Sequence, residues 1–457
     1  MRRRISSSAA ALAAAALLAG AAGAPAAADH RSPAAAPATT KHPYEPGQRP
    51  WTLPRPPAGY TAVFTENVSR HGSRALSDSE DGDLLLALWQ RAADAGALTP
   101  RGQGFAAEVR SLLDANAKVG YGQLTGRGKR EARQTAARMK QRLPGLFAAV
   151  ARDAGNPAGA GTIDVVSSGQ TRAADTGAAF VGGLVDGDPA LAAAVTPARK
   201  DTALLYFHKA PENADYRDYV DHDPRLAATL AGIRDQDRSH RAARRVLERI
   251  FTAPFVDRVA AGEFGGDEIG AAQAVFNLYS VTPALSDEGR WHLDRYIGPA
   301  EAAWFGYLDN AEEFYSKGPG FTGSDITYKM AGVLLDDLFK KLEARRAGTG
   351  GLAAELRFTH AEEVIPLAAL MGLPGSTVQA AADRPYTYAE NPWRGATVSP
   401  MAANIQWDLF RKGDSFLVRM LYNEKPTAFK PACRPVAGHS SFYALDELER
   451  CFGRTGR

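Results

Sequence analysis

The sequence predicts an α/β fold into which a smaller all-helical domain is inserted. Short β-branched and apolar runs, such as 60–65 and 162–167, are each followed by polar residues and then by a helical pattern. After about residue 200 these strand-like runs disappear, and helical segments rich in aromatic residues replace them before strand-like runs return. We therefore expect an α/β domain formed by residues 56–200 and 348–457, with residues 201–347 as an all-helical insert.

The N-terminal part of the chain has the composition of a targeting segment followed by a leader. Three arginines precede an apolar, alanine-rich run, and small residues up to Ala28 offer a cleavage site, so residues 1–28 are predicted to be a secretory signal peptide. The apolar run is short and made mostly of alanine, which argues against a membrane anchor. Residues 29–55 are rich in Ala and Pro and are expected to be extended or disordered until they join the fold.

Composition and charge argue against several classes of partner. The chain of 457 residues is 45% hydrophobic and 23% charged, which is typical of a globular protein. The formal net charge of +3 falls to about zero once the three arginines of residues 1–28 are removed. Attraction for anions must therefore come from a local cluster, and no binding of nucleic acid is expected. No later stretch is apolar for long enough to span a bilayer, so no stable membrane association is expected either.

The chain has two cysteines, Cys433 and Cys451. In an exported protein this pair is expected to form a disulfide, which contributes roughly 3 kcal/mol to stability in the chain-entropy picture. The alternative is two buried free thiols. Because the signal region contains no cysteine, a lipoprotein anchor is excluded, and a metal site built from cysteines is not expected.

Residues 69–74 carry the first candidate chemistry, directly after the first predicted strand. His71 can attack phosphorus, because a neutral imidazole keeps a free lone pair near pH 6 to 7. Arg70 and Arg74 offer planar groups that match the oxygens of a phosphoryl group, and Gly72 allows the backbone to approach an anion closely. The alternative interpretation is a strand end with solvated arginines and one incidental histidine.

Two further predicted strands end in candidate site residues. Arg172 lies between the second strand and a following helix, and His360 and Glu362 come directly after a strand-like run at 356–359. Open α/β sheets place their ligands at the carboxyl ends of strands, so these residues and the first motif are expected to gather at one edge. Each also has an ordinary alternative: Arg172 as a surface arginine, His360 as a core histidine, and Glu362 as a first-turn acid that suits the helix dipole.

These motifs resemble those of a known family of phosphatases. Arg70-His71-Gly72-x-Arg74, followed much later by His360-Ala361-Glu362, is similar to the histidine acid phosphatases, branch 2 of the histidine phosphatase superfamily. Most members of that branch have His-Asp in the late motif, and His-Ala-Glu resembles the subgroup of multiple inositol polyphosphate phosphatases. The resemblance extends from about residue 50 to the C-terminus and includes these segments: 126–134, 143–147, 204–207, 315–320 and 357–372.

The resemblance implies a fold and a set of roles. The fold would be a mixed sheet flanked by helices. His71 would be the nucleophile that forms a phosphohistidine, which water later hydrolyses, and Glu362 would protonate the leaving alkoxide. No metal and no other cofactor is expected, because guanidinium groups would neutralise the transferring group. The phosphoryl oxygens would be held by four side chains: Arg70, Arg74, Arg172 and His360.

Two expectations concern the surroundings of this site. The helical insert is expected to form a lid over the leaving group, with Lys209, Arg217 and Lys317 as candidate rim residues. Successive side chains diverge by about 100° at a helix start, so only one of Glu362 and Glu363 can point into the site. The resemblance assigns that position to Glu362, which makes Glu363 a solvated acid of the first turn.

The resulting hypothesis is an exported phosphomonoesterase that hydrolyses inositol polyphosphates, including inositol hexakisphosphate. It would act on small phosphate esters as a monomer. The first alternative is a broad-specificity acid phosphatase for sugar phosphates or phosphoglycerates, which the acidic run at 77–83 keeps open because acids are an unusual flank for a polyanion site. The remote alternative is a non-catalytic phosphoester-binding module, which would need neither His71 nor Glu362.

Overall fold

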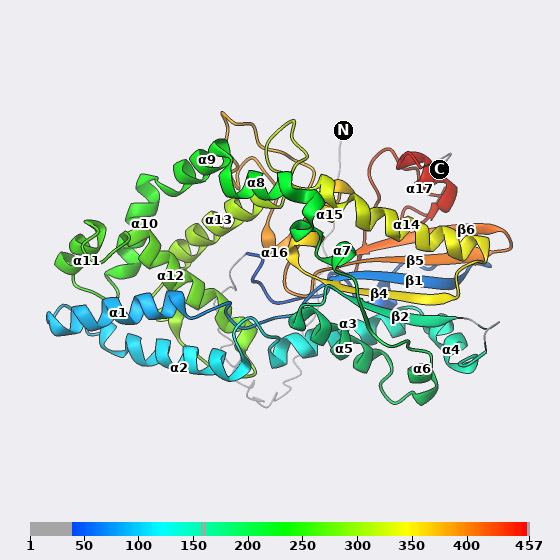
Figure 1. Cartoon of the computed structure of the whole chain (residues 1–457), viewed down its shortest axis with the longest axis horizontal. Coiled ribbons are helices and arrows are strands. Elements are labelled where there is room, and N and C mark those ends of the chain that lie inside the picture. The colour runs from blue at the N-terminus through cyan, green and yellow to red at the C-terminus, as the bar shows by residue number, and fades with distance from the viewer. Residues whose placement is uncertain (1–38, 157–158, 160, 455–457) are drawn as a thin grey trace, which may run out of the picture. The chain divides into compact units, whose positions relative to one another are not determined.

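The computed structural model describes residues 39–156, 159 and 161–454, which belong to one compact unit (Figure 1). The predicted signal peptide and the leader up to residue 38 lie outside the described residues. Within the described part of the chain, no helix is both long enough and apolar enough to cross a membrane.

A mixed β-sheet organises the fold (Figure 1). Among the described residues it has eight strands in the order β3-β2-β4-β1-β5-β6-β7, with β8 paired to β6. Strands β3, β2, β4 and β1 are parallel, whereas β5 and β6 run antiparallel to their neighbours, which confirms the predicted mixed sheet. The strands span Thr61–Arg70 (β1), Thr162–Ser167 (β2), Arg199–Lys200 (β3), Leu352–Thr359 (β4), Asn404–Lys412 (β5), Ser415–Tyr422 (β6), Lys425–Pro426 (β7) and Tyr443–Ala444 (β8).

Helices cover both faces of the sheet, and the strands supply a core to each face (Figure 1). On one face, Val68 of β1 packs in a cluster that includes Leu338 of α14 and Val364 of α15. On the other face, Phe358 of β4 belongs to a cluster with α3, α4 and α5, and its ring centroid lies 5.4 Å from that of Phe180. These helices span Gly126–Arg142 (α3), Pro144–Arg152 (α4), Thr171–Leu184 (α5), Gly332–Ala347 (α14) and Ala361–Leu370 (α15).

The helices α7 to α13 lie between β3 and β4 in the chain. Helix α12 is contacted by α10, α11 and α13, and also by α1, which comes before β2 in the sequence. The division of the chain at residues 201 and 347 stays a prediction. The helices span Glu80–Asp94 (α1), Phe105–Val119 (α2), Thr202–Leu205 (α7), Ala214–His222 (α8), Pro224–Arg234 (α9), Asp237–Leu247 (α10), Ala253–Ala260 (α11), Glu268–Val281 (α12) and Pro299–Ser316 (α13).

Side-chain caps explain where several of these helices begin. The side chain of Asp267 accepts the Gly270 N–H at the start of α12, and Thr125 accepts the Gly128 N–H at the start of α3. Helix α14 begins only at Gly332, and the segment before it is held by tertiary contacts. The Thr327 hydroxyl in that segment donates to the Gly318 carbonyl at 2.7 Å.

The described start of the leader already belongs to the fold. Thr39, Thr40 and Tyr44 are buried. The Tyr44 hydroxyl donates to Glu424 at 2.9 Å, and its N–H donates to Glu131 of α3 at 3.2 Å. The Ala/Pro-rich segment therefore joins the folded unit well before the first strand.

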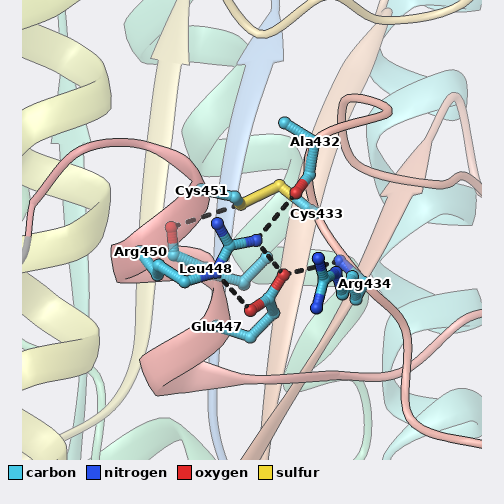
Figure 2. Close-up of a disulfide and its surroundings, with 7 residues drawn as sticks. All are labelled: Ala432, Cys433, Arg434, Glu447, Leu448, Arg450 and Cys451. Atoms are coloured by element: carbon cyan, nitrogen blue, oxygen red, sulfur yellow. Dashed lines mark hydrogen bonds and ion pairs between the residues drawn. A yellow bond between two sulfur atoms is a disulfide. The ribbon is translucent and has the colours of Figure 1, made fainter.

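A disulfide joins Cys433 to Cys451, as expected (Figure 2). It ties the loop before β8 to α17 (Leu445–Cys451), with 5.1 Å between the two Cα atoms. In the same place, Arg450 donates to the Ala432 carbonyl at 2.9 Å, and Glu447 accepts the Arg434 N–H at 2.7 Å (Figure 2). The last helix is thus fixed to the loop by both covalent and polar contacts.

Candidate active site

The carboxyl ends of three parallel strands meet at one edge of the sheet. Arg70 ends β1 opposite Thr359, which ends β4, and Ser167 ends β2 opposite Phe358. The strand pairing continues one step further, because the His71 N–H donates to the Thr359 carbonyl at 2.9 Å. The structure therefore brings together the segments in which the sequence places His71, Arg172 and His360.

The ring of His71 has a free nitrogen. Its Nδ1 atom lies 2.9 Å from the Gly72 carbonyl oxygen, which can only accept, so we assign the hydrogen to Nδ1 and the lone pair to Nε2. Burial, followed by the charge of Arg70, lowers the pKa of His71 well below its ordinary value. The imidazole is therefore neutral at neutral pH and can act as a nucleophile through Nε2.

His360 lies beside His71, with 5.4 Å between the ring centroids. Burial, followed by the charge of Arg172, lowers its pKa to about 3, so this ring is neutral as well. Its Nε2 atom is 2.8 Å from the hydroxyl of Ser168. If the hydroxyl donates there, Nδ1 carries the hydrogen, and Nδ1 is buried with no hydrogen-bond partner among the described residues.

Three arginines surround these rings and keep donors without acceptors. The Nε atoms of Arg70, Arg74 and Arg172 are all buried, and none has a hydrogen-bond partner in the described structure. Each of the three charges lowers the pKa of His71, so all of them lie near its ring. A buried donor without an acceptor costs about 1–3 kcal/mol, which a ligand rich in oxygen acceptors would offset. The arrangement is therefore that of an anion site.

The Nη1 atoms of Arg70 and Arg74 hold these two arginines in place through neutral groups. Nη1 of Arg70 donates to the carbonyls of Thr40 and Ser399, at 2.6 Å each. Nη1 of Arg74 donates to the Ala75 carbonyl at 2.9 Å. Because carbonyls carry no net charge, these contacts orient the side chains and leave their positive charge available to a ligand.

Helix α3 supports the loop that carries His71. Glu131 accepts both the Ser73 N–H and the Ser73 hydroxyl, at 2.8 Å each. A Cβ atom on Gly72 would lie 2.6 Å from the carbonyl oxygen of Gly128. The structure thus adds a packing reason for the glycine, since the loop and α3 approach more closely than any side chain allows.

The two adjacent glutamates of α15 have opposite environments. Glu362 has a side chain that is 29% exposed and lies 3.1 Å from Nζ of Lys317. Glu363 is fully buried, 2.5 Å from Nδ1 of His208, and accepts the Thr359 hydroxyl at 2.9 Å. The expectation that Glu363 would be a solvated acid is therefore wrong, because His208 and Thr359 enclose it.

The candidate rim residues lie in different surroundings. Lys317, just after α13, contacts Glu362 and also Glu313, with 3.1 Å to each. Lys209, at the end of the short helix η3 (Phe207–Lys209), is exposed. Arg217 of α8 donates to the Ala210 carbonyl. The structure thus brings Lys317 to the site and places Arg217 on the backbone of its own region.

The acidic flank noted in the sequence lines a cavity beside Arg74. Arg74, Asp78, Asp81 and Lys41 line a cavity of about 150 Å³. Lys41 also lines a second cavity of about 510 Å³, together with Asp309 and two glutamates of α13. The surroundings of the anion site are therefore mixed in charge.

Three contact residues were not assigned a role from the sequence. Ser168 directly follows β2, so its place at a strand end could have revealed it. His208 stands alone among helical residues and Glu131 looks like an ordinary helix acid, so nothing in the local sequence marks either of them. The ring of Tyr206 also lies near the site, with 5.2 Å between its centroid and that of His360.

Comparison with known proteins agrees with this geometry. The family model of the histidine phosphatase superfamily (branch 2) matches residues 64–423. The chain belongs to this family. It is also 25% identical over 350 residues to multiple inositol polyphosphate phosphatase 1 of Gallus gallus, a match that covers 72% of this chain and 70% of the chicken protein.

Solved structures of other phosphatases have a similar fold. The multiple inositol polyphosphate phosphatase of Bifidobacterium longum, in complex with inositol hexasulfate, is 32% identical, with a TM-score of 0.85 over 91% of this chain and 97% of that one. Its complex with phosphate has a TM-score of 0.86 over the same shares. A phytase from D. castellii, 16% identical with a TM-score of 0.60 over 91% of this chain and 84% of that one, shares the fold.

Proposed function

We propose that this chain is an exported phosphomonoesterase that hydrolyses inositol polyphosphates, including inositol hexakisphosphate, through a phosphohistidine. The observation that carries the proposal is a set of four buried nitrogen atoms near the ring of His71 that have no hydrogen-bond partner among the described residues, beside the free Nε2 of His71. The similarity to a phosphatase whose structure contains inositol hexasulfate supports the substrate class. The four nitrogen atoms are Nε of Arg70, Arg74 and Arg172, and Nδ1 of His360.

In the first step, Nε2 of His71 forms a bond to phosphorus as the bond from phosphorus to the ester oxygen breaks. The carboxyl group of Glu362 gives its proton to the departing oxygen, because an inositol or sugar alkoxide is a poor leaving group without one. The arginines and His360 stabilise the charge that spreads over the phosphoryl oxygens in the transition state.

In the second step, water attacks phosphorus on the opposite side of the bond to His71. The carboxylate of Glu362 takes a proton from this water as the N–P bond breaks, so that inorganic phosphate and the starting ring of His71 result. Each residue returns to its initial state, and the proposed chemistry uses no metal or other cofactor.

The same proposal includes the location of the enzyme and its oligomeric state. The apolar, alanine-rich start of the sequence supports export, with cleavage near Ala28. A disulfide suits an oxidising compartment. We further propose that the chain acts as a monomer on small phosphate esters, with Lys317 on the rim of the site and Lys209 and Arg217 further out.

The acidic cavities favour a second candidate, a broad acid phosphatase for sugar phosphates or phosphoglycerates. Asp78, Asp81 and Asp309 would repel the further phosphate groups of a polyanion. A non-catalytic binding module is disfavoured, since the site holds both a free nucleophile and an acid. Phosphate release from inositol hexakisphosphate, measured beside glycerol phosphate and glucose phosphate, separates the candidates. A clear preference for the first substrate supports our proposal, and equal or lower rates with it would overturn that proposal in favour of the broad phosphatase.

A further inference from the structure

Lys317 connects the proposed acid to a second carboxylate. Its Nζ atom lies 3.1 Å from an oxygen of Glu362 and 3.1 Å from an oxygen of Glu313. The side chain is 19% exposed, so little water shares its charge. Glu313 and Lys317 are separated by one helical turn, which lets the lysine remain paired with Glu313 when it leaves Glu362.

The contact with Lys317 keeps Glu362 ionised, whereas an acid catalyst needs a protonated carboxyl group. Burial alone would raise the pKa of Glu362, but the ammonium of Lys317, followed by His208, holds this pKa well below its ordinary range. Glu362 is therefore a carboxylate in the free protein except under strongly acidic conditions. A carboxylate cannot protonate a leaving alkoxide, so the positive charge beside it must be displaced before the first step.

We propose that Lys317 is a switch operated by the substrate: a phosphate group next to the scissile one draws its ammonium away from Glu362, which then takes up a proton. The proposal rests on the proposed function and names its substrate class, phosphate esters that carry a second phosphate beside the scissile one. The proton passes to the leaving oxygen as the bond from His71 to phosphorus forms. Glu362 is then the carboxylate that the hydrolysis step needs as a base.

The other charged and titratable groups near Glu362 do not distinguish these substrates. Any scissile phosphoryl group neutralises the nearby arginines, whether or not the substrate carries further phosphates. Solvent can supply the proton, because the side chain of Glu362 is partly exposed. Besides Lys317, the groups that interact with it are Arg70 at the end of β1, Arg74 after β1, His360 after β4, Tyr206 after α7, His208 of η3, Tyr216 of α8 and Glu363 of its own helix.

The test is the rate of phosphoenzyme formation, followed by rapid quench at saturating substrate over a range of pH. With the unchanged protein, the rate with glycerol phosphate should fall at a lower pH than the rate with inositol hexakisphosphate. With Lys317→Met, the pH at which the rate with glycerol phosphate falls should rise by at least about one unit. At pH values above this fall, that shift corresponds to about a tenfold gain in rate. The difference between the two substrates should then largely disappear.

Two further variants and one further substrate serve as controls. In Glu313→Gln, Lys317 has only Glu362 as an ion-pair partner. The rate with glycerol phosphate should then fall at a lower pH, which is the opposite of the shift expected for Lys317→Met. Lys329→Met removes an exposed lysine that pairs with Asp215, and it should change neither profile. Nitrophenyl phosphate, whose leaving group needs no proton, reports any pH effect that does not involve the acid.

Two results would overturn the switch. One is that both substrates fall at the same pH with the unchanged protein. The other is that Lys317→Met, or Glu313→Gln if the first variant does not fold, changes both rates equally without moving either profile. If the protein releases no phosphate from inositol hexakisphosphate, the proposed function itself fails, and the switch fails with it. If it releases phosphate but the profiles coincide, only the switch is wrong.

Discussion

Two groups of buried arginines in this protein have opposite surroundings. In the middle of the sheet, Arg357 is fully buried and pairs with Glu66 at 3.1 Å and with Asp337 of α14 at 2.6 Å. Arg142 and Arg419 likewise lie 3.1 and 2.8 Å from the same carboxylate, that of Asp408. These charges are compensated inside the protein, so they are available to no ligand.

At the strand ends the arginines lack this compensation. Arg70 and Arg74 make hydrogen bonds to carbonyl oxygens, and the described residues give neither of them an ion pair with a carboxylate within bonding distance. A buried charge without a partner lowers the stability of the fold. Such charges are therefore expected to persist only where a ligand uses them. Charge compensation, and not burial, therefore separates a structural arginine from a ligand-binding one.

The largest expected effect comes from the residue that the strand-end arginines surround. His71→Ala should abolish turnover, because the ring whose Nε2 lone pair would attack phosphorus is lost. Quenching in alkali should trap a phosphoenzyme with the unchanged protein, and this species should be stable in alkali and labile in acid. Persistence of this species in His71→Ala would show that another residue is the nucleophile.

Replacing the acid should have the next largest effect. Glu362→Gln should lower turnover of inositol phosphates by about a hundredfold to ten-thousandfold, and turnover of nitrophenyl phosphate far less. The matched variant Glu363→Gln weakens a buried contact with His208, so we expect it to lower the melting temperature without this dependence on the leaving group. Equal losses on both substrates for Glu362→Gln would indicate a positioning role instead.

Removing an uncompensated arginine should cost activity and not stability. Arg172→Ala is expected to lower kcat by about a hundredfold to a thousandfold, since one donor to the transition state is lost. The phosphohistidine should still form, more slowly, and the midpoint of unfolding in urea should stay the same or rise. A clear loss of stability would mean that this arginine is structural, like those within the sheet.

Removing a compensated arginine should have the reverse effect. Arg357→Met leaves Glu66 buried without its partner and should lower the free energy of unfolding by about 3–5 kcal/mol. The kcat of the folded fraction should change by no more than a few fold. The double variant Arg357→Met/Glu66→Gln is the control, and it should recover part of the lost stability in urea unfolding.

The smallest expected effect is that of a chelator. Because guanidinium groups neutralise the transferring phosphoryl group in the proposed chemistry, phosphate release should survive treatment with EDTA. Loss of activity that magnesium or zinc restores would contradict this prediction. The control is a substrate solution freed of calcium beforehand, since chelation of calcium bound to the substrate would change the assay by itself.

The strand-end residues could be predicted because local pattern and chemistry coincide there. His71, Arg172 and His360 each follow an apolar run that can be recognised in the sequence. Parallel strands then bring the three ends to one edge, which needs no knowledge of side-chain packing. The mixed sheet itself followed from the resemblance, since periodicity alone does not state the direction of a strand.

The failures have a common physical cause, which is contact between segments that lie far apart in the chain. Glu363 is as polar as Glu362 and adjacent to it, but His208, 155 residues away, comes to lie against it. Gly72 must be small partly because Gly128 of α3 approaches it. Neither contact leaves a periodic pattern, so neither could be anticipated from local sequence.

The contact between Thr40 and Arg70 makes the leader part of the catalytic unit. A carbonyl thirty positions upstream of the arginine helps to set the direction of its guanidinium group. Proteolytic trimming of this leader after Thr40 would therefore remove one of the groups that orient Arg70. A recombinant chain that begins at the first strand would lack that support from the outset.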